Sequence, residues 1–523
     1  MYRYSHNHSD KTSWRTFQKN LQREAKQNTR QNSRVLKKPM QSNTPSFTMR
    51  KSLSLKNIDR SQGRLPLKKI VVSLAIIIAV AFVMQQIVPV FISGAQNFFT
   101  EATAFFKHDA ASFFKELAST QPKSHKKTEN IKSPQKKATT YLSKKDLRTI
   151  LEPQKLLNLK ESLITINDVN RKLNIATSLD MRLQNFLLDQ LDSLALLNRG
   201  KPEVIAMVVM EPHTGRILAM AGFDSHSPDI NPCTEVEYPA ASLFKMVTAS
   251  AAVETHGYSP ATTMYFSGGK YTLYKRQLQE ETNSKFTNKV TLAEAFAQSI
   301  NPVFGKLGSL ILGKDVLEKY ASSFGFNQEI DSEINFKPGS FTITESAYQW
   351  AEVACGFNKT TTISPVFGAM IASTMLNSGK TPVPSIVESV TDTKGVVLYK
   401  RKSETLNDTV KPDTAKALMQ MMNGTVVTGT ARKSFRGVDK DNVLSKLNIG
   451  GKTGSLSNYD KTIRFDWFSG FCSDNKEQEQ IVVSVLVGHG KYIGTKASIY
   501  GRLIFKEYFD NYFALNSKPS TNS

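Results

Sequence analysis

The sequence has few cysteines and no internal repeat. Its three cysteines are Cys233, Cys355 and Cys472. A low and odd count argues against a disulfide framework and against a zinc site, and we expect these side chains to be buried as small apolar groups. The sequence therefore indicates no metal and no other cofactor.

Acidic residues are also fewer than basic residues, and the difference is unevenly distributed along the chain. The 523 residues include 68 Lys and Arg against 45 Asp and Glu, which gives a formal net charge of +23. Residues 1–69 alone contain 17 basic and 3 acidic residues, so most of the excess lies in one tail. Because residues 1–66 lack a sustained apolar period, we expect a disordered, solvated tail. Such a tail can also bind anionic lipid, nucleic acid or an acidic partner, but we expect no nucleic acid.

A membrane-spanning helix is predicted at residues 70–92, which are apolar for 23 positions with few interruptions. As a helix this segment is about 35 Å long, enough to cross a hydrocarbon core of about 30 Å. A buried core helix is the alternative. The long basic leader does not fit a cleaved signal peptide, so we expect an uncleaved signal anchor. Residues 49–69 carry 7 Lys and Arg against 1 in residues 93–113, which places the N-terminus in the cytoplasm and the remainder outside.

The remaining chain divides by composition. The predicted segments are an amphipathic juxtamembrane helix with paired phenylalanines (93–118), a Lys/Ser/Pro spacer (119–145), a small pedestal (146–198), a catalytic domain (199–515) and a polar tail (516–523). The juxtamembrane helix has three interpretations: it lies in the membrane interface, pairs with a partner helix, or packs on its own globular domain. In the pedestal, helical periodicity flanks a strand predicted at residues 173–177.

The catalytic domain shows strand patterns near both of its ends. Two apolar runs at 204–210 and 216–221 flank a Gly-containing turn and predict a hairpin. Later runs at 467–472 and 480–488 are typical of strands, and we expect them to pair antiparallel with the strand that carries Lys452. We therefore predict an α/β (α+β) domain with an antiparallel sheet covered by helices.

A helix predicted over 238–253 begins with Pro239 and carries Ser242 in its first turn. Lys245 follows Ser242 by three positions, so the two side chains leave the same helical face. A serine beside a neutral amine is an activated nucleophile, and both burial and the helix dipole lower the pKa of a lysine at this position. The same Ser-x-x-Lys spacing also occurs at Ser112, Ser124, Ser133 and Ser267. The spacing alone is therefore weak support for a nucleophile.

Two further motifs strengthen the assignment of Ser242. Ser299-Ile300-Asn301 follows at a predicted helix end, and Lys452-Thr453-Gly454-Ser455 contains the only Lys-Thr-Gly of the chain. The ordered set Ser-x-x-Lys, Ser-x-Asn and Lys-Thr-Gly is typical of serine β-lactamases and penicillin-binding proteins. A literal Ser473-Asp474-Asn475 comes after Lys-Thr-Gly in a polar turn, and we assign it no catalytic role.

With these motifs, the sequence resembles the transpeptidase domain of penicillin-binding proteins over roughly residues 173–510. The similar segments outside the three motifs are 176–184, 208–220, 362–379, 426–431 and 467–471. The fold implied is that of the serine β-lactamases and penicillin-binding transpeptidases. Residues 93–202 leave no room for the glycosyltransferase of bifunctional members and look short for the pedestal of the usual monofunctional synthases.

The resemblance implies a role for each catalytic residue. Ser242 would be the acylated nucleophile and Lys245 its base. Ser299 would pass the proton towards the leaving amine, and Asn301 would hold the peptide backbone of the acyl donor.

The resemblance also implies a set of substrate contacts. Lys452, Thr453 and Ser455 would bind the terminal carboxylate of the donor. Gly454 would let the strand approach the donor closely. The backbone N–H groups of Ser242 and Ser455 would form the oxyanion hole.

The implied function is a membrane-anchored D,D-transpeptidase of the bacterial plasma membrane that cross-links peptidoglycan stem peptides at their D-Ala-D-Ala ends. β-Lactams would be covalent inhibitors, and the partners would be the lipid bilayer and a glycosyltransferase or other wall-synthesis proteins. Two alternatives stay open. One is a D,D-carboxypeptidase or β-lactamase, in which water replaces the amine; the other is a penicillin-binding scaffold or sensor with little turnover.

Overall fold

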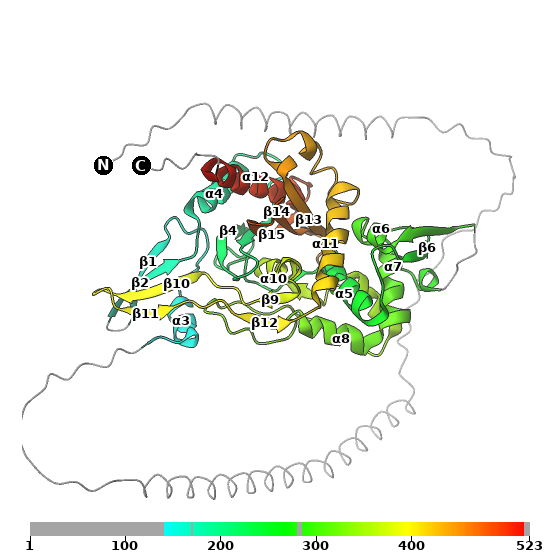
Figure 1. The fold of residues 1–523 in the computed structure, drawn as a ribbon, viewed down its shortest axis with the longest axis horizontal. Helices are drawn as coiled ribbons and strands as arrows, with labels where there is room; N and C mark the ends of the chain where they lie inside the picture. Colours follow the sequence, from blue (N-terminus) through cyan, green and yellow to red (C-terminus); the bar gives the residue numbers. More distant parts are fainter. Residues whose placement is uncertain (1–140, 169–170, 280–284, 517–523) are drawn as a thin grey trace, which may run out of the picture. The chain divides into compact units, whose positions relative to one another are not determined.

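The computed structural model describes residues 141–168, 171–279 and 285–516. Several predicted segments lie outside these ranges: the cytoplasmic tail, the membrane segment, the juxtamembrane helix, most of the spacer, and residues 517–523. Within them, no helix is both long enough and apolar enough to cross a bilayer. The described residues form the body drawn in colour in Figure 1.

A five-stranded antiparallel sheet lies at the centre of this body, in the order β13-β14-β15-β3-β4. Its strands are β3 (Val204–Met210), β4 (Ile217–Asp224), β13 (Leu447–Ser457), β14 (Arg464–Asp474) and β15 (Gln480–His489). The early hairpin and the late antiparallel strands are confirmed. The strand that carries the Lys-Thr-Gly motif, β13, lies at the edge of the sheet.

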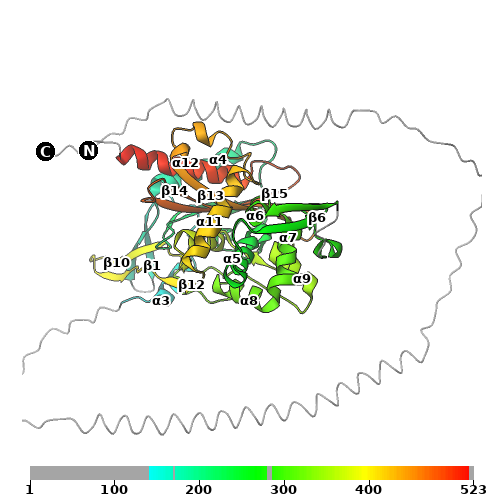
Figure 2. The ribbon, with the colours of Figure 1, turned by 45° about the vertical axis from the view of Figure 1, so that its right-hand side comes forward.

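Alternation along β3 sends its side chains into two cores. Ala206, Val208 and Met210 pack in one cluster with the buried residues of α10 (Pro365–Leu376). The residues between them pack in a second cluster with the apolar faces of α4 (Met181–Ala195) and α12 (Ala497–Asn516). Helices therefore cover both faces of the sheet, as Figures 1 and 2 show.

A mainly helical part adjoins the α10 side of the sheet (Figure 2). Its helices are α5 (Lys245–His256), α6 (Leu292–Ala297), α7 (Asn301–Lys306), α8 (Gly313–Ser323), α9 (Ala347–Cys355) and α11 (Pro412–Val427), with a π-helical turn η3 (Leu307–Leu312) between α7 and α8. Helix α11 packs against β13 as well as against α5 and α6. The interior is rich in aromatic rings, such as Phe244 stacked on Phe341.

A second antiparallel sheet has the order β1-β2-β10-β11. Its strands are β1 (Leu163–Asp168), β2 (Arg171–Thr177), β10 (Val387–Asp392) and β11 (Val397–Lys400). The strand predicted at 173–177 is confirmed as part of β2, but its partner β10 comes from far along the chain. Helix α3 (Lys144–Leu151) and α4 form where helical periodicity indicated them, and α4 packs on the central sheet. Within residues 146–198, β1 and β2 thus belong to a sheet that later strands complete, and α4 packs on the central sheet.

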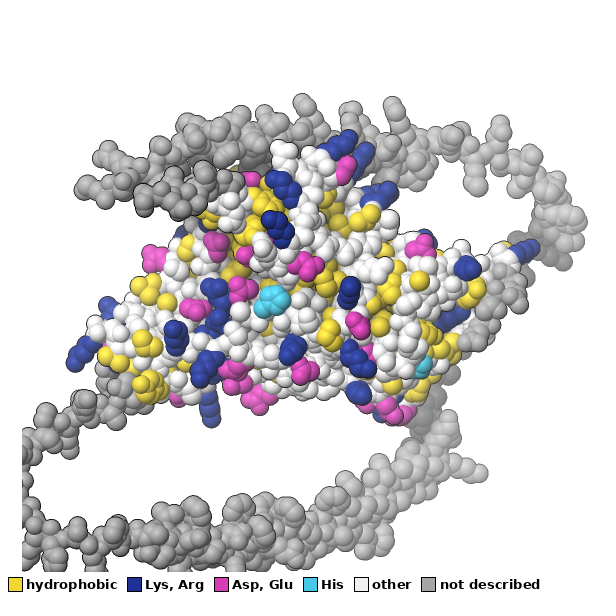
Figure 3. Space-filling view, in the orientation of Figure 1, with side chains coloured by type: hydrophobic (Ala, Val, Ile, Leu, Met, Phe, Trp, Pro, Cys, Tyr) yellow, Lys and Arg dark blue, Asp and Glu magenta, His cyan; other side chains and the backbone are white. Residues whose placement is uncertain are grey.

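Three small sheets complete the strand inventory of the described residues. They pair β5 (Tyr238–Pro239) with β8 (Thr362–Ile363), β6 (Thr263–Ser267) with β7 (Thr287–Thr291), and β9 (Lys380–Pro382) with β12 (Thr405–Asp408). The surface seen in Figure 3 mixes Lys and Arg with Asp and Glu. This mixing agrees with a charge excess that lies mainly in the tail.

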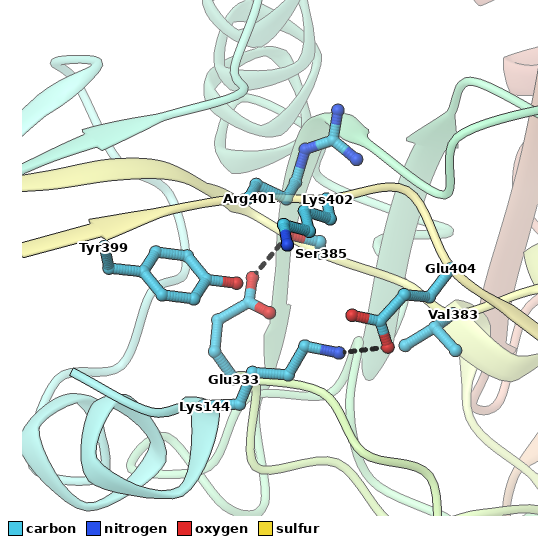
Figure 4. A pocket seen from close by; sticks show the side chains of 8 residues that line it. All are labelled: Lys144, Glu333, Val383, Ser385, Tyr399, Arg401, Lys402 and Glu404. Carbon is cyan, nitrogen blue, oxygen red and sulfur yellow. Dashed lines mark hydrogen bonds and ion pairs between the residues drawn. The ribbon is translucent and has the colours of Figure 1, made fainter. Parts of the chain in front are cut away.

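A polar pocket lies between the second sheet and the loop that carries Glu333 (Figure 4). Glu333 is buried, and its carboxylate is hydrogen-bonded. Its Oε1 atom accepts hydrogen bonds from Ser385 Oγ at 2.7 Å and from the backbone N–H groups of Ile386 and Val387 at 2.8 and 2.9 Å. At the mouth of the pocket, Lys144 Nζ lies 2.5 Å from Glu404 Oε2. The carboxylate of Glu333 therefore holds the chain where it enters β10.

Candidate active site

The segment around Ser242 departs from the single helix predicted at 238–253. Tyr238 and Pro239 form strand β5, a 3₁₀ turn η1 (Ala241–Phe244) follows, and the α-helix begins only at Lys245. The prediction that Pro239 starts the helix was therefore wrong. Pairing of β5 with β8 keeps the proline extended, and the chain then turns sharply at Ala241, whose φ is +47°.

Lys245 Nζ touches three oxygen atoms in the interior. It lies 2.7 Å from Ser242 Oγ, 2.8 Å from Asn301 Oδ1, and in hydrogen-bond contact with the carbonyl oxygen of Cys355. A neutral amine has two N–H groups and one lone pair. Two of the three partners can only accept, so in the neutral state the remaining lone pair faces the hydroxyl of Ser242.

Burial also makes the neutral state of Lys245 accessible. The side chain is completely buried, and this desolvation lowers the pKa of its amine to about 8. The described carboxylates form no ion pair with it. Ser242 therefore has beside it a group that can accept its proton near neutral pH.

Ser299 lies in the short connection between α6 and α7, and Asn301 is the first residue of α7, so the motif falls at helix ends as predicted. Ser299 has a φ of +55°, and its backbone N–H donates to Phe296 O. The backbone N–H of Asn301 donates to Lys270 O. Both side chains are nearly buried, and this tight turn directs them to the two lysines of the site.

Lys452 brings the edge strand β13 into the same site. Its Nζ atom donates to Ser299 Oγ and to Thr453 O, both at 2.9 Å. The side chain is completely buried, and this burial, together with the nearby charge of Lys245, holds the pKa of Lys452 well below its usual range. The buried side chains of Lys245 and Lys452 thus link the three sequence motifs by hydrogen bonds.

The residues after Lys452 lie next to the backbone of the nucleophile. A Cβ atom on Gly454 would lie 3.4 Å from the backbone nitrogen of Ser242, so the missing side chain leaves room for close approach. Thr453 Oγ1 lies in hydrogen-bond contact with Thr430 Oγ1. Ser455 is exposed, and its Oγ atom accepts a hydrogen bond from Arg464 Nε.

Four contributors to the site were not found by sequence reasoning: the carbonyl of Cys355, Gly356, Thr430 and Arg464. Thr430 lies inside the similar segment 426–431, which was the available signal. Its backbone N–H donates to Ala297 O at the end of α6, so it links the Ser299 turn to β13. Cys355 contacts Lys245 and Gly356 packs against Ala241, both between distant parts of the chain, whereas the contact of Arg464 with Ser455 depends on the register of β13 and β14.

The literal Ser473-Asp474-Asn475 segment has a structural role. Asp474 Oδ1 accepts from the backbone N–H groups of Gln478 and Glu479, so Ser473-Asp474-Asn475 serves the β14–β15 turn. The three cysteines are buried and unpaired, as expected, and burial raises the pKa of Cys355 to about 11. Across the described residues, His, Cys, Asp and Glu form no group that could hold a metal ion.

The cluster of motifs agrees with a family comparison. The family model described as the penicillin binding protein transpeptidase domain matches residues 205–509, more than half of the chain. The chain belongs to this family. The match includes all three motifs of the transpeptidase site as well as the strands and helices that hold them.

Named relatives of this transpeptidase domain are distant. Stage V sporulation protein D of Bacillus subtilis is 23% identical over 296 residues, which cover 54% of this chain and 44% of the relative. Peptidoglycan D,D-transpeptidase PbpA of Mycobacterium tuberculosis is 25% identical over 328 residues, which cover 54% of this chain and 62% of the relative. The chain thus spans less than two thirds of either protein.

Solved structures show the same fold. The D,D-transpeptidase domain of a peptidoglycan glycosyltransferase from Eggerthella lenta has a TM-score of 0.51 at 23% identity and covers 65% of this chain and 83% of that one. Penicillin binding protein 3 of Mycobacterium tuberculosis has a TM-score of 0.53 at 17% identity, with coverage of 65% and 79%. The expected transpeptidase-like fold of a helix-covered antiparallel sheet is therefore confirmed.

Proposed function

We propose that this protein is a serine D,D-transpeptidase that cross-links peptidoglycan stem peptides. The observation that carries the proposal is the contact of Ser242 Oγ with a buried amine, Lys245 Nζ, whose other two partners are hydrogen-bond acceptors. This arrangement supports acyl transfer through the serine. Family membership and a relative named as a peptidoglycan D,D-transpeptidase supply the substrate class.

In the proposed first half-reaction, Ser242 Oγ attacks the carbonyl carbon between the two terminal D-Ala residues while Lys245 accepts the hydroxyl proton. The C–N bond then breaks, and the terminal D-Ala leaves as an amine after it takes up a proton. Ser299, which accepts a hydrogen bond from Lys452, is placed to pass on that proton. The product is an ester between Ser242 and the shortened stem peptide.

In the second half-reaction, the amine of a neighbouring stem peptide attacks this ester. A new amide bond forms, the C–O bond to Ser242 breaks, and the serine recovers its proton. The N–H groups of Ser242 and Ser455 are proposed to stabilise the oxyanion in both halves, which commonly contributes about 2.7–4 kcal/mol per donor. β-Lactams would acylate the same serine and stop the cycle.

The test is incubation of the purified protein with a donor peptide that ends in D-Ala-D-Ala, with and without an amine acceptor. Mass spectrometry should show release of D-Ala and a cross-linked product that requires the acceptor. The Ser242→Ala variant should give neither product. Hydrolysis of the donor with no acceptor product would indicate a carboxypeptidase, and β-lactam binding without turnover would indicate a scaffold or sensor.

We also propose that residues 70–92 anchor the protein in the plasma membrane, with the transpeptidase domain outside. The proposal rests on the apolar length of this segment and on the basic residues that precede it, because the segment lies outside the described residues. Protease added to intact cells, or to spheroplasts if there is an outer membrane, should degrade the transpeptidase domain and spare the N-terminal tail. Protection of the transpeptidase domain would contradict the proposed topology.

A further inference from the structure

Glu352 lies on helix α9, one turn before the residue whose carbonyl bonds the base. Cys355 O accepts a hydrogen bond from Lys245, and Glu352 precedes Cys355 by three positions, so the two residues share a face of the helix. Helix α9 lies beside α7, as Figure 2 shows, and Ala351 and Ala354 pack there against glycines of α7 and η3. Glu352 therefore lies on the side of α9 that carries Cys355.

A tyrosine on the same face joins Glu352 to the segment that follows strand β6. Tyr348 precedes Glu352 by four positions, and its hydroxyl donates a hydrogen bond of 2.8 Å to Leu273 O. The phenol lies near the carboxylate, because burial raises the pKa of Tyr348 and the charge of Glu352 raises it further. In the same segment, Lys270 O accepts the backbone N–H of Asn301. This segment therefore links Tyr348 to the Ser-x-Asn motif.

Among the described residues, the carboxylate of Glu352 has no partner of opposite charge. No Lys, Arg or His of the described ranges lies at ion-pair distance from it, and no group there donates a hydrogen bond to it. Lys275 Nζ lies 5.9 Å from the centroid of the Tyr348 ring and forms no ion pair with Glu352. Glu352 is nevertheless partly buried, and this burial raises the pKa of its carboxyl group. A cation that arrives beside such a carboxylate offsets part of the cost of its desolvation.

The surroundings of Glu352 suit an ammonium group. Tyr274, which lies close to Tyr348, has 63% of its surface exposed. An ammonium ion is attracted both by a carboxylate and by the face of an aromatic ring. The second half-reaction requires an amine, and a free primary amine with a pKa of about 10.4 is an ammonium ion at neutral pH. The acceptor therefore approaches the acyl-enzyme as a cation.

We propose that Glu352, with Tyr348 and Tyr274 beside it, binds the ammonium group of the acceptor stem peptide. The inference rests on the proposed function for the identity of the acceptor. Binding holds the ammonium one helical turn from the contact between Cys355 and Lys245. Glu352 acts before the attack: it binds the ammonium, and the amine then loses one proton to solvent and attacks the ester. Its carboxylate is a binding group and not the base, because a carboxylate is a much weaker base than an amine.

The first test measures how the acyl-enzyme divides between water and an added acceptor. The donor peptide ends in D-Ala-D-Ala, and the acceptor probe is N-acetyl-L-Ala-γ-D-Glu-L-Lys, whose side chain carries one ammonium. Glu352→Gln should raise the KM for the acceptor about 10- to 100-fold, because one charge-assisted hydrogen bond is lost. It should leave the release of D-Ala without acceptor unchanged. Glu352→Asp should recover part of the loss, since it keeps the charge.

Glu318→Gln is the matched control. Glu318 is an exposed glutamate on α8, a helix that packs against α9. Its replacement should leave the KM for the acceptor unchanged. Thermal unfolding checks the fold, and Glu352→Gln should not lower the midpoint, because no described residue loses a hydrogen-bond partner. An unchanged acceptor KM in Glu352→Gln, or an equal rise in Glu318→Gln, would overturn the proposal.

A second comparison distinguishes the ammonium of the acceptor from one on the donor. Two penicillins that differ only in an ammonium group on the acyl side chain serve as donor analogues for Ser242. Glu352→Gln should leave the ratio of their second-order acylation rate constants unchanged. A selective loss for the penicillin that carries the ammonium would place Glu352 on the donor side and overturn the assignment to the acceptor.

A binding measurement keeps the inference separate from turnover. In the Ser242→Ala background, calorimetry compares the acceptor tripeptide with its Nε-acetyl derivative. The free amine should bind more tightly, and Glu352→Gln should remove that preference. If the preference persists in Glu352→Gln, the inference about Glu352 fails while the proposed transpeptidase function stands. If Glu352→Gln removes the preference but the unaltered protein forms no cross-linked product, the proposed function fails while the ammonium site stands.

Discussion

A Cβ atom on Gly356 would lie 1.8 Å from the carbonyl oxygen of Ala241, the residue immediately before the nucleophile. Gly356 ends helix α9 with a φ of +69°, and the carbonyl of the preceding Cys355 accepts a hydrogen bond from Lys245. The end of α9 therefore contacts two parts of the site: Cys355 contacts the base Lys245, and Gly356 contacts the turn that leads into Ser242.

We expect Gly356→Ala to move the Ser242 turn away from Lys245 and to reduce β-lactam acylation at least tenfold. The added methyl group meets backbone atoms, which cannot rotate aside. Gly257→Ala is a matched control, because Gly257 also ends a helix with a positive φ, of +62°, but has no atom within 4 Å of its Cβ position. It should cost only about 1 kcal/mol of unfolding free energy through backbone strain. Equal acylation rates for the two variants would contradict the assigned contact.

The choice of serine can be tested directly. Ser242→Ala should abolish covalent labelling by a fluorescent β-lactam, because no other hydroxyl in the described part of the chain contacts the amine of Lys245. Ser267→Ala should label normally, although Lys270 follows Ser267 at the same spacing. Lys270 Nζ contacts Gln298 Oε1 instead of the serine. An adduct that maps to a peptide without Ser242 would show that the nucleophile is misassigned.

The pH dependence of acylation should follow the proton on Lys245. Its pKa is lowered to about 8, and the base must be neutral to accept a proton. The rate constant should therefore rise up to about tenfold per pH unit below 8 and level off above it. The measurement is the acylation rate of one β-lactam from pH 6 to pH 9. A rate constant that does not change over this range would exclude Lys245 as the base.

Replacement of Lys245 by arginine separates its charge from its basicity. Arginine stays protonated, so Lys245→Arg should lose about 10²–10⁴-fold in acylation rate. Lys289→Arg, an exposed substitution in β7, is the control and should retain the full rate. Circular dichroism and thermal unfolding check that both variants are folded. Full activity in Lys245→Arg would mean that another group accepts the proton.

Glu333, which lies outside the active site, should matter for stability alone. Glu333→Ala removes one carboxylate and leaves two buried backbone N–H groups without their acceptor, so we expect a loss of about 2–3 kcal/mol of unfolding free energy. Glu318→Ala, at an exposed position on α8, should change stability by less than about 0.5 kcal/mol. Denaturant unfolding measures both. Equal midpoints would show that the buried carboxylate does not hold the entry to β10.

The sequence predicted the parts of the site that local patterns encode. Alternating and apolar runs placed the hairpin and the late strands, and motif spacing selected Ser242, Ser299 and Lys452, which the structure brings together. Pro239 was misread because a proline before an Ala-rich run is a common local helix start. A distant strand, β8, competes for this segment and keeps the proline extended.

Two other features depend on three-dimensional burial and register. The resemblance implied that Lys452 binds the carboxylate of the donor, and the structure adds that its amine is buried and bonded to Ser299. The contact between Arg464 and Ser455 depends on how β13 and β14 are aligned, because a shift of one residue would send Arg464 to the opposite face. Neither fact can be obtained from spacing along the chain.

The strand order of the central sheet has a consequence for how the protein acquires its activity. β15 lies between β14 and β3, so the first hairpin gains its neighbour only when nearly the whole domain has been synthesised. Pairing between such distant segments gives a high contact order and slow folding. Until it happens, the free side of β3 is an apolar sheet edge, the kind of surface on which chains aggregate. The nascent protein therefore needs protection from aggregation for longer than a chain whose neighbouring strands are consecutive in sequence.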